Sequence, residues 1–329
     1  MNQIAGKRFF ITGGAGFVGS TISDQLLAAG AAEIRIIDNF VRGNWSNVKH
    51  ALASGRVKVT EGDIRDAELV DALTEGADYV FHQAALRITR CAEAPREAVE
   101  VLMTGTLNVL EAAVRHKVKK IVAASSASVY GEPSYLPMDE AHPFNNRTLY
   151  GAGKIANEQM YRAYYTTYGL PYVALRYFNV YGPRMDLTGV YTEVLIRWLE
   201  AIEAAKPPLI FGDGEQSMDF VFIEDVARAN LLALQSDVTD EVFNVGTGVQ
   251  TTLKQLCAAL LKLTGSSLKP EHRPARAVAN VSRRRSSTEK AEQMLGFRAG
   301  VTLEEGLQRL IEWRDSDEVK QALAAAAQL

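Results

Sequence analysis

RFFITGGAGFVG, residues 8–19, is the stretch of sequence that decides the fold. The apolar run RFFIT is typical of a buried strand, and it leads directly into Gly13, Gly16 and Gly19 and then into a helical pattern. Glycine permits a tight turn and lets backbone N–H groups approach a pyrophosphate, whose charge is favoured at the positive N-terminus of a helix. The stretch therefore predicts a strand, a turn and a helix that bind a dinucleotide.

Short apolar runs alternate with helical patterns through the first half of the chain. After RFFIT the runs are EIRIID (33–38), VKVTEGD (57–63), DYVFHQA (78–84), KKIVAASS (119–126) and PYVALRY (171–177). Residues 95–117 carry apolar residues at three- and four-residue spacing, which predicts a helix that crosses over between two parallel strands. This alternation predicts an α/β fold with a Rossmann-type, doubly wound parallel sheet.

The regular alternation breaks after about Tyr181, where loops surround short helical segments. Strand and helix patterns return in DFVFIEDVARANLLAL and EVFNVG. We therefore expect residues 1–180 to form the dinucleotide-binding domain, with 218–248 returning to it. Residues 181–217 and 249–329 are expected to form a smaller mixed α/β domain that binds the substrate.

The second apolar run ends in Asp38, about 20 residues after the glycine turn, where a carboxylate accepts hydrogen bonds from ribose hydroxyls. The alternative is a structural glycine turn followed by a surface aspartate. A carboxylate repels the 2′-phosphate of NADP, although Arg35 or Arg42 could compensate, so the sequence predicts NAD. Asp63 and Ile64 follow the third run and are expected near the adenine; a helix N-cap in GDIRD is the other interpretation.

Tyr150 and Lys154 lie four residues apart in YGAGK, so their side chains share one face of a predicted helix. A phenol with a pKa of about 10 is a poor base near neutral pH, but a nearby ammonium favours its phenolate. An exposed helical pair is the alternative. Ser125, Ser126 and Ser128 lie at the end of the run KKIVAASS, at the sheet edge where open parallel sheets bind ligands, and one of them is expected to bridge substrate and tyrosine.

Several segments match one enzyme family along nearly the whole chain. They are TGGAGFVGS, GDIRD, HQAA, GTLNVLEAA, SSASVYGEP, YGAGK, RYFNVYGPR and FGDGEQSMDFVFIEDVARA. With these segments the sequence resembles the extended short-chain dehydrogenase/reductases, in particular the nucleotide-sugar 4-epimerases. The resemblance implies that Tyr150 is the general base, that Lys154 orients the ribose and lowers the tyrosine pKa, and that Ser126 hydrogen-bonds the reacting hydroxyl. Ser128 would be an accessory contact.

The resemblance also implies the cofactor contacts and the reaction. The residues expected to bind NAD are Gly13, Gly16, Phe17, Val18, Asp38, Asn39, Asp63, Ile64, Ala84, Ala85, Tyr150 and Lys154. Hydride would pass from C4 of a UDP-hexose to NAD and return to the other face of the 4-keto sugar. Related dehydratases and decarboxylases carry acids where this chain has Ala127 and Ser128, which favours epimerisation. Another NAD-dependent nucleotide-sugar oxidoreductase, a 4,6-dehydratase or a reductase, is the alternative, and an inactive NAD-sensing scaffold is a third.

The substrate contacts are transferred in the same way. Asn179 resembles the family asparagine that contacts the nucleotide diphosphate. Phe211 resembles the aromatic residue that packs on uracil, and the alternative is that it is a core aromatic at a strand end. Arg276 is the candidate for an arginine that binds the pyrophosphate. Two positions depart from the family pattern. Met218 replaces an expected phosphate-binding arginine, and Leu102 replaces an expected asparagine behind the active site.

Additional cations lie where the resemblance places the sugar. They are Arg87, Arg90 and the run 283–285, in which Arg284 is the candidate ligand. A solvated face is the usual interpretation of such a run. The sharper hypothesis is that one of these arginines pairs with a carboxylate on the substrate, which would make the sugar a uronic acid, N-acetylated or not.

Bulk properties exclude several classes of partner. The formal charge is −3, from 36 basic and 39 acidic residues, so nothing predicts binding to nucleic acid or an anionic membrane. No stretch approaches the length of a membrane span, and with no apolar signal core at the N-terminus a cytoplasmic location is expected. Two distant cysteines give neither a disulfide framework nor metal-ligand spacing. By resemblance, the helix after Tyr150 and the helix before Ser125 would form the four-helix interface of a homodimer.

Overall fold

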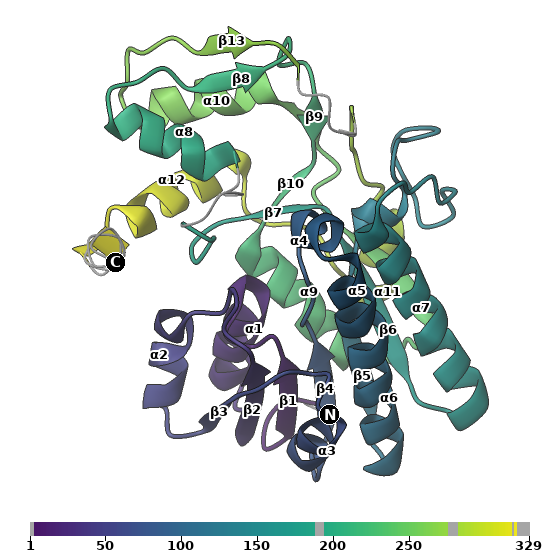
Figure 1. Ribbon diagram of the computed structural model, residues 1–329. Helices are drawn as coiled ribbons and strands as arrows, with labels where there is room; N and C mark the ends of the chain where they lie inside the picture. The colour runs from purple at the N-terminus through teal and green to yellow at the C-terminus, as the bar shows by residue number, and fades with distance from the viewer. Residues whose placement is uncertain (1–2, 188–193, 276–281, 318, 321–329) are drawn as a thin grey trace.

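A seven-stranded parallel sheet forms the centre of the protein, shown here as a computed structural model that describes residues 3–187, 194–275, 282–317 and 319–320 (Figure 1). Its strands, in spatial order, are β11 (Glu241–Val245), β6 (Tyr172–Tyr177), β5 (Lys120–Ser126), β4 (Tyr79–His82), β1 (Arg8–Thr12), β2 (Glu33–Asp38) and β3 (Val57–Glu61). Every adjacent pair is parallel. The doubly wound α/β fold predicted from the sequence is confirmed.

Helices cover both faces of this sheet because neighbouring strand residues point to opposite faces. Phe9 and Ile11 of β1 pack in one buried cluster, beneath α1 (Phe17–Ala28) and α9 (Ile223–Gln235). Phe10, between them, packs in a second cluster beneath α3 (Ala67–Thr74), α6 (Gly105–Arg115) and α7 (Leu149–Tyr168). A further helix, α2 (Trp45–Ala53), follows β2.

The crossover predicted for residues 95–117 joins β4 to its neighbour β5, but it is not one uniform α-helix. After α4 (Ile88–Glu93), the chain forms α5 (Pro95–Val99), a π-helical turn η1 (Glu100–Thr104) and then α6. Leu102 in the π turn is buried, and a methyl group placed at Gly153 of α7 would lie 2.6 Å from its Cδ1. The π turn therefore seats the crossover closely against α7.

A smaller layer lies beyond the carboxyl ends of the strands (Figure 1). It contains α8 (Val194–Glu203), α10 (Leu253–Leu263), α12 (Leu303–Arg314) and the strand pair β8 (Leu209–Phe211) and β13 (Glu271–Arg273), around a third buried cluster. Two further strand pairs connect the layers: β7 (Asn179–Tyr181) with β10 (Phe220–Phe222), and β9 (Ser217–Met218) with β12 (Thr251–Thr252). Within 218–248, α9 and β11 rejoin the large sheet, followed later by α11 (Glu289–Leu295) against β11. The domain boundaries themselves stay a prediction.

Two observations concern the whole described part of the chain. None of its helices is long and apolar enough to cross a membrane, and it contains no group of three or more His, Cys, Asp or Glu side chains arranged to hold a metal ion. Cys91 and Cys257 are both buried and unpaired thiols.

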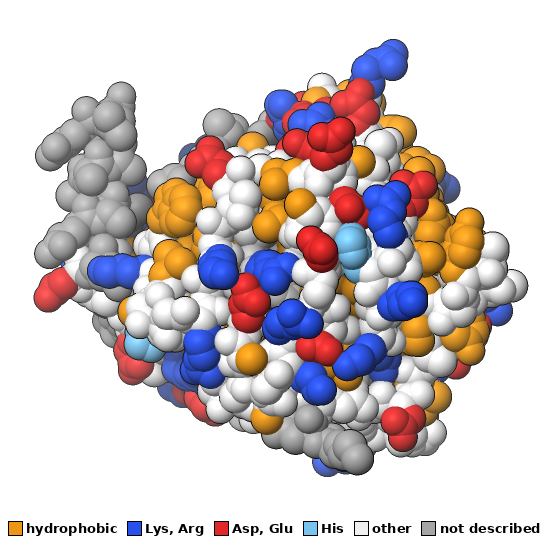
Figure 2. All heavy atoms as spheres, turned by 90° about the horizontal axis from the view of Figure 1, so that it is seen from below, with side chains coloured by type: hydrophobic (Ala, Val, Ile, Leu, Met, Phe, Trp, Pro, Cys, Tyr) orange, Lys and Arg blue, Asp and Glu red, His pale blue; other side chains and the backbone are white. Residues whose placement is uncertain are grey.

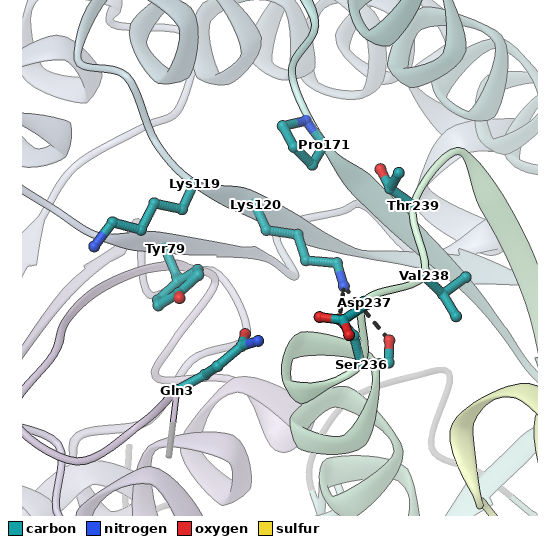
Figure 3. Close-up of a pocket in the computed structure, with 9 residues that line it drawn as sticks. All are labelled: Gln3, Tyr79, Lys119, Lys120, Pro171, Ser236, Asp237, Val238 and Thr239. Carbon is teal, nitrogen blue, oxygen red and sulfur yellow. Dashed lines mark hydrogen bonds between the residues drawn. The ribbon is translucent and has the colours of Figure 1, made fainter. Parts of the chain in front are cut away.

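The amino ends of the strands form a charged surface on which acidic and basic side chains lie side by side (Figure 2). A pocket of about 250 Å³ opens there, and two of its lining residues are Lys119 and Lys120 (Figure 3). Lys120 is buried and donates to the carbonyl oxygens of Ala233 (2.7 Å) and Ser236 (2.8 Å), at the end of α9. Lys119 instead forms a half-exposed ion pair with Asp78 at 2.7 Å. Lys120 therefore completes the hydrogen bonding of a helix end.

Replacing each lysine with methionine compares the contribution of the buried Lys120 to stability with that of the half-exposed Lys119. Lys120→Met should lower the free energy of unfolding by about 1–3 kcal/mol, because buried carbonyl oxygens lose their donor. Lys119→Met should cost about 0–1 kcal/mol, as expected for a surface ion pair. Urea denaturation of both variants measures the difference, and equal losses would contradict the role given to Lys120.

Candidate active site

The glycine turn after β1 is shaped by close backbone approach. Gly13 has a φ of +68°, and a methyl group there would lie 2.8 Å from the backbone of Ala84, at the end of the neighbouring strand β4. Gly16 is the N-cap of α1, and no side chain caps this helix. Unpaired N–H groups in a first helical turn suit a pyrophosphate. The predicted cofactor residues around this turn are Gly13, Gly16, Phe17, Val18, Ala84 and Ala85, and the residues present fit a dinucleotide.

Asp38 is fixed at the end of β2, where the ribose is expected. Its carboxylate accepts hydrogen bonds from the backbone N–H groups of Ala15 and Phe40, each at 3.0 Å, and burial raises its pKa. Arg35, which might have compensated a 2′-phosphate, instead pairs with Glu33 at 3.2 Å. Asp38 therefore connects the glycine turn to the loop after β2.

The residues predicted near the adenine lie together after β2 and β3. The side-chain amide of Asn39 donates to Asp63 at 3.4 Å, and Asp63 forms an ion pair with Arg65 at 2.8 Å that lowers the aspartate pKa. Ile64 is buried. The other interpretation, a helix N-cap in GDIRD, applies to Asp66, whose side chain accepts from the first turn of α3.

The predicted catalytic residues meet at the carboxyl end of β5. Helix α7 begins at Leu149, so Tyr150 and Lys154 lie on successive turns of one face. Ser126 lies close to the Tyr150 hydroxyl and lowers the pKa of the phenol. The Lys154 ammonium donates to the carbonyl oxygen of Ala124 at 2.7 Å and lies 5.9 Å from the centre of the Tyr150 ring.

The three candidate serines separate in the structure. Ser125 is buried and donates to Glu158 on α7 at 2.5 Å. Ser126 faces Tyr150, and its Oγ also accepts from the backbone N–H of Ser128 at 3.1 Å. The arrangement leaves Ser126 as the hydroxyl between tyrosine and an incoming substrate.

Burial controls the protonation of this group. It lowers the pKa of Lys154 to about 8 and raises the pKa of Tyr150, against which act the Ser126 hydrogen bond and the positive charges of Arg284 and Arg42. His82, enclosed beside Lys154, has its pKa lowered by burial to about 3 and is therefore neutral. A charged lysine thus faces the phenol in surroundings with little water.

Arg284 is the half-buried arginine of the run, whose neighbours Arg283 and Arg285 are exposed. Its Nε is buried without a hydrogen-bond partner in the described structure, and burial lowers its pKa to about 10, against the opposing influence of Glu132 and Tyr150. Its backbone N–H donates to the carbonyl of Ser217 in β9 at 2.8 Å. The guanidinium is therefore held within electrostatic reach of the Tyr150 hydroxyl, with bonding capacity left for a ligand.

The segment that carries Arg284 is fixed on both sides. On one side, the backbone N–H of Ser282 donates to Glu132 at 3.0 Å. On the other side, the hydroxyl of Ser286 donates to the buried carboxylate of Asp219 at 2.5 Å. The backbone is therefore fixed on both sides of Arg284.

The other predicted arginines are placed differently. Arg87 after β4 and Arg42 after β2 both approach the same oxygen of Asp186, each at 3.4 Å. Arg90 on α4 forms an ion pair with Glu97 at 2.8 Å and has 52% of its side chain exposed. Arg90 thus matches the solvated alternative better than Arg87 does.

The remaining predicted substrate residues lie in or near the upper layer. Asn179 of β7 has a buried Oδ1 with no hydrogen-bond partner in the described structure. Phe211 ends β8 and is half-buried, and Met218 lies in β9. Arg276 lies outside the described residues. Leu102 packs in an apolar cluster with Cys91 against which Tyr150 lies, where a polar group was expected.

Two acidic residues at this site were missed by the sequence analysis. Glu158 follows Lys154 by four residues, and the spacing that joined Lys154 to Tyr150 would have placed it on the same face. Asp186 lies in the loop after β7, and nothing in the sequence marks its contacts with two arginines that are distant along the chain.

The comparisons with known proteins agree with this geometry. The model of the NAD dependent epimerase/dehydratase family matches residues 9–246. A UDP-glucose 4-epimerase of Mycolicibacterium smegmatis is 36% identical over 93% of this chain and 98% of its own, and a UDP-N-acetyl-alpha-D-glucosaminuronate decarboxylase of Bacillus cytotoxicus is 32% identical over 93% and 97%. The UDP-glucuronic acid 4-epimerase of Bacillus cereus, solved with UDP-glucuronic acid and NAD, superposes with a TM-score of 0.85 at 27% identity, covering 96% and 99% of the two chains.

These matches span the cofactor-binding half and most of the remaining chain. They confirm the predicted enzyme class and its cofactor, NAD. The chain belongs to the NAD dependent epimerase/dehydratase family.

Proposed function

We propose that this protein is a UDP-sugar 4-epimerase whose substrate is a UDP-hexuronic acid, with or without an N-acetyl group. The observation that carries the proposal is the group formed by Tyr150, Ser126 and Lys154, with the half-buried Arg284 within electrostatic reach of it. The first three side chains suit removal of a hydroxyl proton, and the fourth suits an anionic substituent.

The side chains divide the work on the sugar. Bound NAD supplies the hydride acceptor for C4. Tyr150 takes the proton from O4, and Ser126, which lies beside Tyr150, orients this sugar hydroxyl. Lys154 favours the phenolate by its charge. After the 4-keto sugar has rotated, Tyr150 returns the proton when the hydride is delivered to the opposite face.

The positions after Ser126 favour epimerisation over elimination. Ala127 is buried and Ser128 is uncharged, so neither supplies an acid or a base for expulsion of water from C5 and C6. Glu132, the next acidic residue along the chain, is occupied by Ser282. A dehydratase or a reductase would therefore require acids from elsewhere.

Arg284 supports an acidic substrate. The buried and unpaired Nε of this guanidinium is costly unless a ligand anion completes its hydrogen bonds. A planar carboxylate matches the fork of a guanidinium. The structural neighbour from Bacillus cereus, which carries UDP-glucuronic acid, shows that this fold accommodates such a sugar.

Incubation of the purified protein with UDP-sugars tests the proposal. UDP-glucose, UDP-N-acetylglucosamine and their uronic acids are supplied without added NAD, and C4 epimers are separated. We expect conversion of a uronic acid, because the cofactor is regenerated in each cycle. Tyr150→Phe should retain NAD and lose activity by about 10²-fold or more, since only the base is removed.

Other outcomes would contradict parts of this proposal. Net formation of NADH with one turnover per cofactor would indicate an oxidoreductase that releases its product, and loss of water from the sugar would indicate a dehydratase. Binding of nucleotide sugar and NAD without turnover would support a scaffold.

Arg284→Met and Arg90→Met form a matched pair for the acidic substrate. Arg284→Met should lower kcat/KM for the uronate by about 10- to 100-fold, equivalent to about 1.4–2.8 kcal/mol, with a smaller effect on the neutral hexose. Arg90→Met should change little, because Arg90 is already paired with Glu97 at the surface. Unchanged selectivity in Arg284→Met would eliminate the uronate assignment.

The predicted homodimer has a candidate surface on the crossover helix. Val99, Met103 and Leu107 are exposed by 44%, 39% and 36%, at four-residue spacing along α5, η1 and α6. On α7, Tyr161 is fully buried whereas Tyr168 is 59% exposed. A second copy that packs these helices against their counterparts would cover this apolar face.

Met103→Glu should convert the dimer to a monomer, because it places a charge in the centre of this face. Sedimentation equilibrium measures the change, and Val249→Glu, an exposed apolar residue distant along the chain, is the control. A wild-type monomer, or a dimer that tolerates Met103→Glu, would eliminate this surface as the interface.

A further inference from the structure

A buried ion pair lies directly behind the candidate catalytic residues. Glu158 on α7 and Arg176 on β6 are each 3% exposed, and the two carboxylate oxygens accept from Nε (2.8 Å) and the terminal nitrogen (2.7 Å) of the guanidinium. A buried pair of this kind often contributes less to stability than hydrophobic residues of the same volume. Stabilisation of the fold alone therefore does not explain the Glu158–Arg176 pair.

The carboxylate of Glu158 joins the two elements that carry the catalytic side chains. It accepts from the hydroxyl of Ser125 at 2.5 Å, and Ser125 immediately precedes Ser126 at the end of β5. Glu158 also lies one helical turn after Lys154 on the same face of α7. One side chain thus fixes the strand of Ser126 against the helix of Tyr150 and Lys154.

The charges around Lys154 make Glu158 important electrostatically. The titratable groups that act on the ammonium are His82 on β4, Cys91 on α4, and Tyr150 and Glu158 on α7. Burial keeps His82 neutral by lowering its pKa and keeps the Cys91 thiol neutral by raising its pKa. Among these groups, Glu158 is the one that supplies a negative charge while Tyr150 is protonated.

We propose that Glu158 is a positioning residue of this catalytic centre: its carboxylate, held by Arg176, aligns Ser126 with Tyr150 and keeps Lys154 charged. This inference rests on the proposed function for its catalytic meaning. The alignment and the charge are properties of the protein that can be measured without a substrate.

The same network continues toward the substrate arginine. Arg176 donates to the Tyr130 hydroxyl at 2.9 Å, and Tyr130 donates to Asn244 of β11 at 2.6 Å. The Asn244 amide then donates to the carbonyl oxygens of Met138 (2.9 Å) and Ser287 (3.2 Å), the second of which lies three residues after Arg284. Buried polar networks in which each member is paired have little freedom to rearrange. The alignment therefore extends from α7 to the segment that presents Arg284.

Glu158→Gln removes the charge and keeps the shape. Loss of the negative charge should make Lys154 deprotonate at lower pH, and a displaced Ser126 should lower the pKa of Tyr150 less than it does in the wild type. The bell-shaped pH profile of kcat should therefore narrow from both sides, by about half a pH unit or more in total. Asp225→Asn, which alters another buried carboxylate that accepts from an arginine, should leave the profile unchanged.

A second readout separates this inference from the proposed function. The absorbance of tyrosinate is titrated in the NAD-bound protein, and the same variant carrying Tyr150→Phe is subtracted to isolate Tyr150. Glu158→Gln should raise the apparent pKa of Tyr150 by about half a unit or more, because Ser126, once displaced, no longer lowers it. This titration tests the role of Glu158 even if the protein epimerises no UDP-sugar.

Further variants protect the test against misfolding, because Glu158→Gln leaves a buried guanidinium incompletely paired. Glu158→Leu/Arg176→Met replaces the pair by apolar residues and should fold with the same altered titration. Ser125→Ala removes one hydroxyl and should lower kcat several-fold with KM unchanged, through displacement of Ser126. Wild-type Tyr150 titration in the folded double variant, or full kcat in Ser125→Ala, would overturn the proposal.

Discussion

The burial of a charged lysine beside a tyrosine is the constraint on which the rest of this site depends. Lys154 is 2% exposed. In the fold it lies near the neutral His82, the neutral thiol of Cys91 and apolar side chains. An ammonium in such surroundings requires hydrogen-bond acceptors and a compensating charge. The carbonyl oxygen of Ala124 meets the first requirement, and Glu158 meets the second from the next turn of α7. The parallel sheet brings these groups to Lys154, because the carboxyl end of β5 packs against the first turns of α7.

The substrate side of the site is assembled from segments distant in sequence. Arg284 takes its place from β9, from the loop after β5 and from the buried Asp219, which lie between 65 and 152 positions away along the chain. A cation supported in this way cannot be moved without changing several contacts at once. Specificity for an acidic sugar would then be a property of the tertiary structure, whereas the cofactor turn after β1 is local in sequence.

This difference explains what the sequence could predict. The glycine turn, Asp38 and the spacing of Tyr150 and Lys154 depend on neighbours along the chain, and the structure places them together as expected. The π turn at 100–104 was not predicted, because the same residues suit an α-helix. Without the family resemblance, which named Ser126, the residues did not separate Ser126 from Ser125, and the sequence offered both Arg284 and Arg90, because these choices depend on Glu158 and Glu97 reached through folding.

In the proposed reaction a hydride leaves C4 of the sugar and returns to it within one site. A UDP-sugar deuterated at C4 tests this reaction, with both epimers recovered after equilibration in ordinary water. We expect the deuterium to stay at C4 in substrate and product, because the protein would retain the cofactor between the two transfers. Loss of the deuterium to water, or its transfer to NAD that exchanges with added cofactor, would contradict it.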